Sequence, residues 1–436
     1  MEVKKYKLGE LLSKIENGAV IKQNKGATGI PITRIETLSN GLFNRGKLGY
    51  ADIEDPTLYA NYVLEDNDLL MSHINSKEFV GRTVIYKKQE NECIIHGMNL
   101  LRIKTNAKLL DPEFAYYYFQ TDTIKRSLYN LRKDAIGQSS IAISDIKNMV
   151  VSVPNISIQK EIAFVLRCYD RRIELNRAIN QNLEAMAKQL YDYWFVQFDF
   201  PDENGKPYKS SGGKMVWNEK LKRKIPENWE VMELKDVVNV NRGISYNSET
   251  ILGDGVPMIN LASFNVDGTY KHSGIKTYNG NYSEDKILKP FDLIMCNTQQ
   301  TSIDFSKDII GKAFLVPFIF EGDVVSSHHV TTLIPKQKEM KAYLAYLSNT
   351  KHFHKYATGC CSGTNIMGLN YIGLSLYKME IPPVKLLQQF ESMIIQIEKR
   401  KGLIILENEM LTKQRDELLP LLMNGQVSVN SDLSDD

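Results

Sequence analysis

Two short segments carry side chains that could bind a metal ion, and each lacks part of what such a site needs. The histidines and cysteines between positions 352 and 361 (HFHKYATGCC) are chemically able to ligate zinc, but no second pair follows at a finger-like spacing. Asp202, Glu203 and Lys206 resemble a nuclease carboxylate set, yet they lie in a segment rich in Gly, Ser and Pro, whereas metal-binding carboxylates need a rigid sheet to hold them together. The sequence therefore favours core and surface roles for these residues.

Motifs for phosphate binding and for adenine methylation are also incomplete. The segment GTNIMG, from Gly363 to Gly368, has two glycines at P-loop distance, but no Lys-Ser or Lys-Thr follows to hold phosphates. The segment IPPV, which begins at Ile381, lacks the Asn or Asp and the aromatic residue with which an adenine methyltransferase holds a flipped base. We therefore expect no catalytic site and no bound cofactor in this chain.

Side chains suited to binding DNA lie on loops at three matched places in the two halves of the chain. Arg, Asn and Gln can make paired hydrogen bonds with base edges, and Lys, Ser and Thr can contact phosphates. The first place offers Ser72, His73, Asn75, Lys77 and Arg82, matched by Asn297, Thr298, Gln299, Gln300 and Thr301; the second offers Arg132, Lys133, Gln138 and Ser139, matched by Lys355, Thr364 and Asn365; the third offers Lys22, Gln23, Asn24 and Lys25, matched by Arg242, Tyr246 and Asn247. These residue types are also common on ordinary solvated loops, so the prediction concerns the loops as groups.

The loops match because the sequence is duplicated. KLGELL from Lys7 and ELKDVV from Glu233 are 226 residues apart, as are IPIT from Ile30 and VPMI from Val256. VLEDNDLLM and ILKPFDLIM, and then GRTVIY and GKAFLV, continue the match with small drifts that indicate loop insertions and deletions. Turn residues followed by apolar runs predict strands, and FAYYYFQ and MKAYLAYL predict helices. We therefore expect two similar mixed α/β domains, at residues 1–155 and 227–384.

The two histidines His328 and His329 could make polar contacts in the second repeat. His96 lies in the matching region of the first repeat. This similarity favours a shared structural position for His96 and His328.

Each repeat is followed by a long heptad helix, predicted at 156–198 and 385–424. Their seams comprise Ile162, Leu166, Tyr169, Ile173, Asn176, Asn180, Leu183, Leu190 and Trp194, and Phe390, Ile394, Ile397, Ile404, Asn408, Leu411, Leu418 and Leu422. At 1.5 Å per residue, the 39 residues from Ser157 to Phe195 of the first helix would form a rod of roughly 58 Å. Antiparallel pairing would set Asn176 against Asn408 and parallel pairing would set Asn180 against Asn408, so the asparagines alone leave the direction open.

The remaining segments and the composition predict the linker, the tail and the cellular compartment. Residues 199–226 lack apolar periodicity and are predicted to be a linker, and residues 425–436 a tail. The formal net charge of +2 excludes a polycation that would bind any anion indiscriminately. Five cysteines without framework spacing, no apolar leader and no run of ~18 apolar residues indicate a soluble cytoplasmic protein without a membrane span.

Three junctions resemble one family closely: LYDYWFVQFDFP from Leu190, IPENWEVMELKDV from Ile225 and LLPLLMNGQV from Leu418. They are similar to the specificity subunit of type I restriction-modification systems, and the resemblance covers essentially the whole chain. It implies two target recognition domains that each read half of a bipartite site in double-stranded DNA. It also implies an antiparallel helix pair that sets the gap and docks two modification (methyltransferase) subunits.

In that family, S-adenosylmethionine belongs to the modification subunit, and ATP and magnesium belong to two restriction/translocase subunits. The resemblance thus implies a DNA-binding, non-catalytic chain. Two alternatives stay open at this point: a coiled-coil adaptor that binds only proteins, which the near-neutral charge allows, and a single-chain DNA-modifying enzyme.

Overall fold

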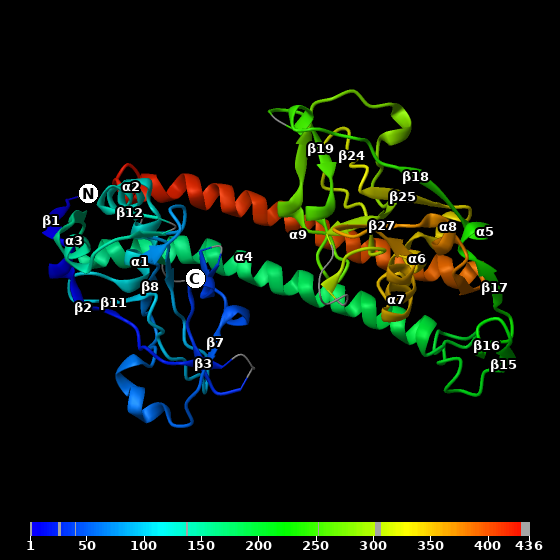
Figure 1. Ribbon diagram of the computed structural model, residues 1–436, viewed down its shortest axis with the longest axis horizontal. Coiled ribbons are helices and arrows are strands. Elements are labelled where there is room, and N and C mark those ends of the chain that lie inside the picture. Colours follow the sequence, from blue (N-terminus) through cyan, green and yellow to red (C-terminus); the bar gives the residue numbers. More distant parts are fainter. Residues whose placement is uncertain are drawn as a thin grey trace. The chain divides into compact units, whose positions relative to one another are not determined.

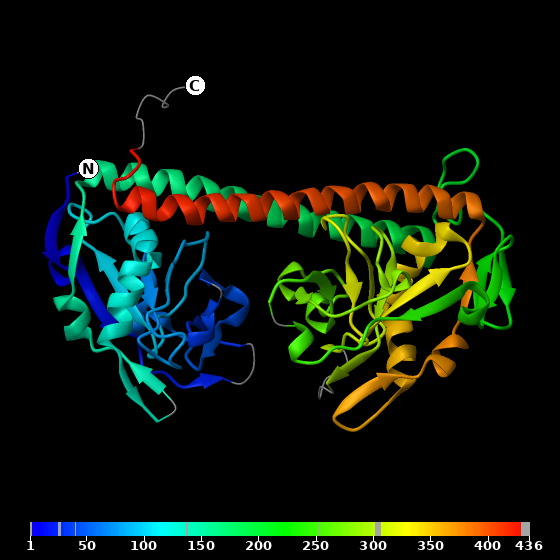
Figure 2. The same ribbon diagram turned by 90° about the horizontal axis from the view of Figure 1, so that it is seen from above.

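The computed structural model describes residues 2–24, 28–39, 41–136, 138–251, 253–300 and 307–428 (Figures 1 and 2). The chain divides into two compact units, unit 1 at Met1–Ile173 with Leu411–Asp436, and unit 2 at Glu174–Met410. Each unit contains one sequence repeat and a segment of each long helix, α4 (Ile156–Tyr191) and α9 (Val384–Met423). The helices are therefore shared between the units and do not form compact bodies of their own. No helix in the described residues is long and apolar enough to cross a membrane.

Unit 1 is built around a four-stranded antiparallel sheet in the order β10-β8-β11-β2. Its strands are β2 (Leu12–Asn17), β8 (Leu69–Met71), β10 (Thr83–Ile85) and β11 (Leu101–Thr105). Successive residues of β8 enter different cores, as the alternation of a strand requires. Leu69 and Met71 share a cluster with Phe114 of α1 (Pro112–Gln120), whereas Leu70 packs with Val84 in another. The sheet thus has both faces covered.

The other elements of unit 1 surround this sheet. They are β1 (Lys4–Lys7) paired with β14 (Val150–Val153); β3 (Gln23–Asn24), β7 (Gly49–Ala51) and β4 (Ile30–Ile32) in one small sheet; β5 (Leu38–Ser39) with β6 (Leu42–Phe43); and the helices α2 (Asp122–Leu131) and α3 (Ile143–Asn148). Asp111 caps α1 by accepting a hydrogen bond from the Phe114 N–H at 2.9 Å, and Pro112 occupies the first turn. The fully buried Gln159 of α4 donates to the carbonyl oxygens of Leu109 and Pro154 at 2.9 and 2.8 Å. These contacts fix α4 to the end of the repeat.

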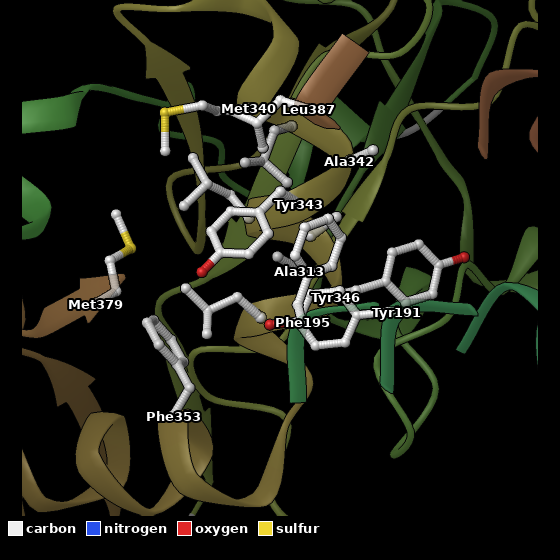
Figure 3. Close-up of a cluster of buried hydrophobic side chains, with 14 of the residues drawn as sticks. Tyr191, Phe195, Ala313, Met340, Ala342, Tyr343, Tyr346, Phe353, Met379 and Leu387 are labelled. Atoms are coloured by element: carbon white, nitrogen blue, oxygen red, sulfur yellow. The ribbon is translucent and has the colours of Figure 1, made fainter. Parts of the chain in front are cut away.

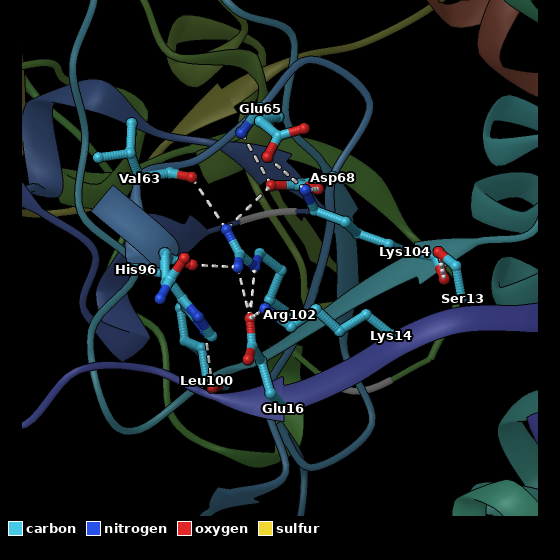
Figure 4. A network of polar contacts seen from close by, with 11 residues as sticks. Ser13, Lys14, Glu16, Val63, Glu65, Asp68, His96, Leu100, Arg102 and Lys104 are labelled. Carbon is cyan, nitrogen blue, oxygen red and sulfur yellow. Dashed lines mark hydrogen bonds and ion pairs between the residues drawn. The ribbon is translucent and has the colours of Figure 1, made fainter. Parts of the chain in front are cut away.

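A buried arginine organises the strand ends of unit 1 (Figure 4). Arg102 of β11 is 2% exposed, and its guanidinium contacts Glu16 and lies 3.7 Å from an oxygen of Asp68. It also donates to the carbonyl oxygen of Val63 at 2.9 Å. Burial opposes ionisation of Glu16, but hydrogen bonds from Lys14 and Arg102 outweigh it and hold the pKa of Glu16 below its ordinary value. A buried charge is stable only when it is paired, and here the carboxylates and carbonyl oxygens around the Arg102 guanidinium supply the partners.

Unit 2 repeats the design with a four-stranded antiparallel sheet in the order β18-β25-β21-β23. Its elements are β17 (Glu230–Glu233), α5 (Leu234–Val237), β18 (Val238–Arg242), β19 (Val256–Ile259), β20 (Lys276–Tyr278), β21 (Leu293–Cys296), β23 (Ala313–Leu315), β24 (Val325–Ser326), β25 (Val330–Pro335), α6 (Lys341–Ser348), α7 (Lys351–Gly359), α8 (Tyr371–Ser375) and β28 (Lys378–Ile381). β17 pairs with β28 as β1 pairs with β14. The predicted fold class, two similar mixed α/β domains each followed by a long helix, is confirmed.

The duplication extends to unusual backbone geometry. Asn67 and Phe291 both adopt left-handed conformations, with φ of 67° and 65°, although neither is glycine. The next residue in each case is an aspartate, Asp68 or Asp292, whose carboxylate accepts a hydrogen bond at 2.8 Å from the main-chain N–H three residues earlier. The same tight turn therefore starts the same central strand in both units.

The end of α4 is anchored in an aromatic core of unit 2 (Figure 3). A π-helical turn continues α4 over Asp192–Val196 and places Phe195 in this core. The Phe195 ring centre lies 5.0 Å from that of Tyr343 in α6 and 4.9 Å from that of Phe390 in α9, both in edge-to-face geometry. Such pairs add to the free energy gained by burial. The cluster ties both long helices to the second repeat.

The prediction that residues 199–226 form a linker is wrong. This segment contains an antiparallel hairpin, β15 (Met215–Asn218) and β16 (Arg223–Pro226), and buries Phe200 and Ile225 in the core of unit 2. The ring of Phe200 stacks on that of Tyr208 at 4.7 Å. Its few apolar residues were too widely spaced to show a period, because they meet partners from distant elements instead of each other.

The two long helices pair antiparallel, as the family resemblance implied. In unit 2, Asn176 donates to the side-chain oxygen of Asn408 at 3.0 Å, and the Lys401 ammonium group lies 2.5 Å from Glu184. In unit 1, Arg415 reaches Asp170 at 2.5 Å. Every predicted seam residue is buried or half-buried. Polar pairs therefore specify the register within each unit, and the parallel alternative is excluded.

We expect Asn176→Leu to destabilise unit 2 by roughly 1–3 kcal/mol, because it leaves the amide of Asn408 without its partner. Replacing both asparagines with leucine should recover most of that loss. Urea unfolding of the two single variants and the double variant would measure the coupling. A single variant as stable as the unaltered protein would contradict the role given to this pair.

We expect a pH-dependent contribution from Glu391 of α9, which accepts a hydrogen bond from the Ala342 N–H of α6 at 2.8 Å. Burial raises the pKa of Glu391 from 4.5 to about 7. Between these values the folded state binds more protons than the unfolded state, so the free energy of unfolding should fall as pH rises. Glu391→Gln should flatten this slope in urea titrations between pH 4.5 and 7. An unchanged slope would show that Glu391 titrates normally.

Candidate nucleic-acid interface

A second, smaller sheet in each unit joins two loops that are far apart in the sequence. In unit 1, β9 (Ile74–Asn75) pairs with β13 (Gln138–Ser140), which pairs with β12 (Lys133–Ala135); in unit 2, β22 (Thr298–Gln300) pairs with β27 (Ile366–Leu369), which pairs with β26 (Cys361–Ser362). We call these the outer sheets. Figure 2 shows that the hairpin of each outer sheet, teal in unit 1 and orange in unit 2, projects away from the helix segments of its own unit. In each repeat, residues of the first and second candidate loops are thus joined in one sheet.

Matching main-chain hydrogen bonds within each unit show which residues of the two outer sheets are equivalent. The Ile141 N–H donates to the His73 carbonyl oxygen at 2.9 Å, and the Leu369 N–H donates to that of Asn297 at 2.8 Å. His73 and Asn297 therefore occupy equivalent positions. The two residues that follow are Ile-Asn in unit 1 and Thr-Gln in unit 2. The same backbone therefore presents different hydrogen-bonding groups.

Asp134 is the centre of a charged cluster on the outer sheet of unit 1. Its carboxylate lies 2.5 Å from the Arg132 guanidinium and 3.6 Å from the Lys77 ammonium, and it accepts a hydrogen bond from the Ser139 hydroxyl at 2.7 Å. The bonds from Arg132 and Ser139 lower the pKa of Asp134 to about 2. Arg132 also lies 3.8 Å from the centre of the Tyr129 ring. Arg132, which lies between α2 and β12, is thus held against the outer sheet by its neighbours.

Other candidates of unit 1 are more accessible. Lys77, Lys133 and Gln138 are exposed on or beside the outer sheet. Asn75 and Arg82 are half-buried, and the Arg82 guanidinium lies 4.5 Å from the centre of an aromatic ring. Lysines and a glutamine at the hairpin are the groups best placed to meet a ligand.

The outer sheet of unit 2 has a different set of contacts. The Thr298 hydroxyl lies 2.6 Å from Nδ1 of His329, and the Gln299 amide donates to Asp308 at 2.8 Å. Thr364 and Asn365 are exposed between β26 and β27, whereas Lys355 is exposed on α7 and not on a loop as predicted. Gln300 lies in β22, and Thr301 falls outside the described residues, as Lys25 does in unit 1.

Four candidates are buried, contrary to their prediction as loop residues that reach a groove. Ser72 is 1% exposed, Ser139 4%, and His73 and Asn297 6% each. Burial lowers the pKa of His73, which favours its neutral form. Asn297 donates to Thr331 Oγ1 of β25 at 2.8 Å. Ser72, His73 and Asn297 lie between a central strand and an outer strand, and Ser139 lies within β13. These four residues therefore support the outer sheets and do not form their surface.

The third candidate group has separate surroundings in the two units. In unit 1, Lys22 is exposed, Asn24 donates to Asp52 at 3.2 Å, and Gln23 accepts a hydrogen bond from Arg34, a residue that sequence reasoning missed. Sequence spacing gave no signal for Arg34, because it reaches Gln23 only through the pairing of β3, β7 and β4.

In unit 2, Arg242 and Asn247 are exposed, and Asn247 accepts hydrogen bonds from the N–H groups of Glu249 and Thr250 at 3.1 and 3.0 Å. Tyr246 is half-buried, with its ring centre 5.5 Å from that of His328. Tyr246 thus lies against the exposed ring of His328.

The expectation that His328 shares a position with His96 is wrong. The Ala19 N–H donates to the His96 carbonyl oxygen at 2.8 Å, and the Ile244 N–H donates to that of Ser326 at 2.7 Å. His96 is therefore equivalent to Ser326, and it is fully buried, with Nε2 2.8 Å from the Leu100 carbonyl oxygen. His328 is exposed, two residues further along.

The residues weighed as zinc ligands are held by other contacts. His354 Nδ1 lies 3.1 Å from the Ile310 carbonyl oxygen. The Cys361 thiol donates a hydrogen bond to the Ala357 carbonyl oxygen at 3.2 Å. Within the described ranges, no three His, Cys, Asp or Glu side chains gather closely enough to hold a metal ion.

Comparison with known proteins gives a consistent result. The family described as the type I restriction modification DNA specificity domain matches residues 1–185 and 226–407. The chain is 27% identical over 437 residues to a Methanocaldococcus jannaschii protein provisionally named the type I restriction enzyme MjaX specificity subunit, covering 97% of this chain and 93% of that one. It is 29% identical over 185 residues to the EcoKI specificity subunit of Escherichia coli, covering 42% and 38%.

The fold is also known from a solved structure. The crystal structure of the type I restriction-modification system S subunit from M. genitalium matches with a TM-score of 0.57 and 16% identity, covering 97% of this chain and 96% of that one. Because the family's domain matches twice and together covers most of the sequence, this protein belongs to the family of type I restriction-modification specificity subunits and carries two of its specificity domains in tandem.

Proposed function

We propose that each unit reads one half of a bipartite site in double-stranded DNA, and that partner subunits act on the DNA so selected. The observation that carries this proposal is the contrast between the two units. Their central sheets share strand order, turn geometry and backbone hydrogen bonds, whereas their outer sheets present different side chains. Two readers of different half-sites need this combination of a common scaffold and separate surfaces.

The outer sheets have a shape and chemistry that suit a DNA groove. The major groove of B-DNA is wide enough for a two-stranded β-ribbon, and each base pair shows a distinct donor and acceptor pattern there. In unit 1, Gln138 can make paired hydrogen bonds with adenine, and Lys77 and Lys133 can contact phosphates. In unit 2, Asn365 of the outer-sheet hairpin and Lys355 of α7 offer the same two kinds of contact. Local basic groups of this kind are consistent with a net charge of only +2.

The helices would act as the spacer between half-sites and as the docking surface for two modification subunits. This part rests on the family and on the finding that α4 and α9 each contribute to both units. In the proposed assembly, S-adenosylmethionine is bound by the modification subunits, and ATP and magnesium are bound by two restriction/translocase subunits. The complex would work in the cytoplasm, where chromosomal and invading DNA meet it.

We expect adenine methylation at a split motif in a host that carries this chain and its modification partner. Replacing Lys133 and Gln138 with alanine should alter or relax only the half read by unit 1, because both side chains are exposed and support no core contact. Replacing Lys355 and Asn365 should change only the other half. Sequencing of methylated bases across the genome would show both effects. An active partner without any split motif would exclude the proposal.

We expect the gap between the halves to follow helix length. Inserting seven residues after Ile173 in α4 and seven after Met410 in α9 keeps the heptad phase and adds about 10.5 Å, or about three base pairs of DNA. The methylated motif should keep both halves and lengthen its gap. Insertion in one helix alone should abolish methylation, since it breaks the antiparallel register. An unchanged gap in the double insertion would refute the spacer role.

A further inference from the structure

In each unit, a glycine allows two backbone segments to approach closely beside the central sheet. A Cβ atom on Gly18 would lie 2.2 Å from the Gly97 carbonyl oxygen, and one on Gly243 would lie 2.1 Å from that of Ser327. No residue other than glycine fits at such a distance. The segments 19–21 with 97–99 in unit 1, and 244–246 with 327–329 in unit 2, are thereby fixed in the same arrangement. We call this the bridge patch of each unit.

The bridge patch of unit 1 is an apolar rim over a pocket. Val20 is 77% exposed and Met98, the equivalent of His328, is 48% exposed. Both line a pocket of 350 Å³ together with Arg34 and Asn99. Gly49 leaves room for the Arg34 guanidinium, because a Cβ there would lie 2.2 Å from Nε of Arg34. The pocket therefore has the methyl groups of Val20 and Met98 at its rim and the Arg34 guanidinium in its wall.

The bridge patch of unit 2 is made of rings. The ring centres of His328 and His329 are 3.8 Å apart, and that of Tyr246 lies 5.5 Å from His328. The Lys276 ammonium lies 5.7 Å from the centre of the Tyr246 ring. His329 is 2.6 Å from the hydroxyl of Thr298, which belongs to the outer sheet. The rings therefore continue the outer sheet of unit 2 as one surface.

We propose that the bridge patch is a second specificity-determining surface in each unit, reading a base pair of the half-site beyond those read by the outer sheet. This inference rests on the proposed function. Val20 and Met98 offer apolar contact to a thymine methyl group, and His328 and Tyr246 offer hydrogen bonds to a base edge. The backbone of the patch is the same in both units while its exposed side chains differ in kind, as base readers on a shared scaffold should.

The test is methylation mapping with the complete complex and single substitutions in the patches. His328→Ala should relax one base pair in the half read by unit 2 by about tenfold, and Met98→Ala should do the same in the half read by unit 1. Each should leave the other half unchanged. Matched controls are His352→Ala, another exposed imidazole of unit 2, and Leu58→Ala, an exposed apolar residue of unit 1. Both controls should give the unaltered motif.

The reciprocal exchange Met98→His sharpens the test, since it should change the preferred base and not merely weaken preference. If the unaltered complex gives a split motif but His328→Ala, Met98→Ala and Met98→His all keep it, the patch does not read DNA, while the proposed function stands. If the unaltered complex gives no split motif, the proposed function itself fails. Circular dichroism melting would identify a variant that loses methylation through unfolding, and the more conservative His328→Gln and Met98→Leu would then decide the question.

Discussion

The antiparallel pairing of α4 with α9 is the constraint on which the rest of the structure depends. Apolar seam residues alone would tolerate a shift by one heptad, but polar pairs do not, because a shifted amide or ammonium group would be buried without a partner. Asn176 with Asn408, and Lys401 with Glu184, fix the pairing in unit 2, and Arg415 with Asp170 fixes it in unit 1. Each repeat is then anchored to a segment of α4 and a segment of α9.

Much of this architecture is visible in the sequence, because repeats and heptads are periodic. The nearly constant offset between repeats gave the two domains, and the seam positions gave both helices. What was missed depends on contacts between distant segments. Phe200 and Ile225 find their partners in elements that no local pattern connects to them, so the β15–β16 hairpin looked like a linker. The buried Arg102 likewise gives no sequence signal, since its burial depends on Glu16 and Asp68.

In the candidate site, too, local patterns were visible in the sequence, whereas contacts between distant segments were not. The sequence suggested the loops as groups, but only the structure shows that the pairing of β9 with β13 and of β22 with β27 joins them into outer sheets. Residue types could not separate Gln138, which is exposed, from Asn297, which is buried. The match of His96 to His328 failed because a shared residue type is weaker evidence of equivalence than a shared hydrogen bond.

Gly18 and Gly243 have a consequence for how new variants of this protein could arise or be built. The close approach is held by main-chain atoms and by the absence of a side chain, so it makes no demand on the residues displayed around it. A library that randomises the exposed positions 20, 98 and 99, or 245 and 328, should therefore fold at high frequency. Because of these glycines, the exposed residues of the bridge patch can change while the backbone that carries them keeps its conformation.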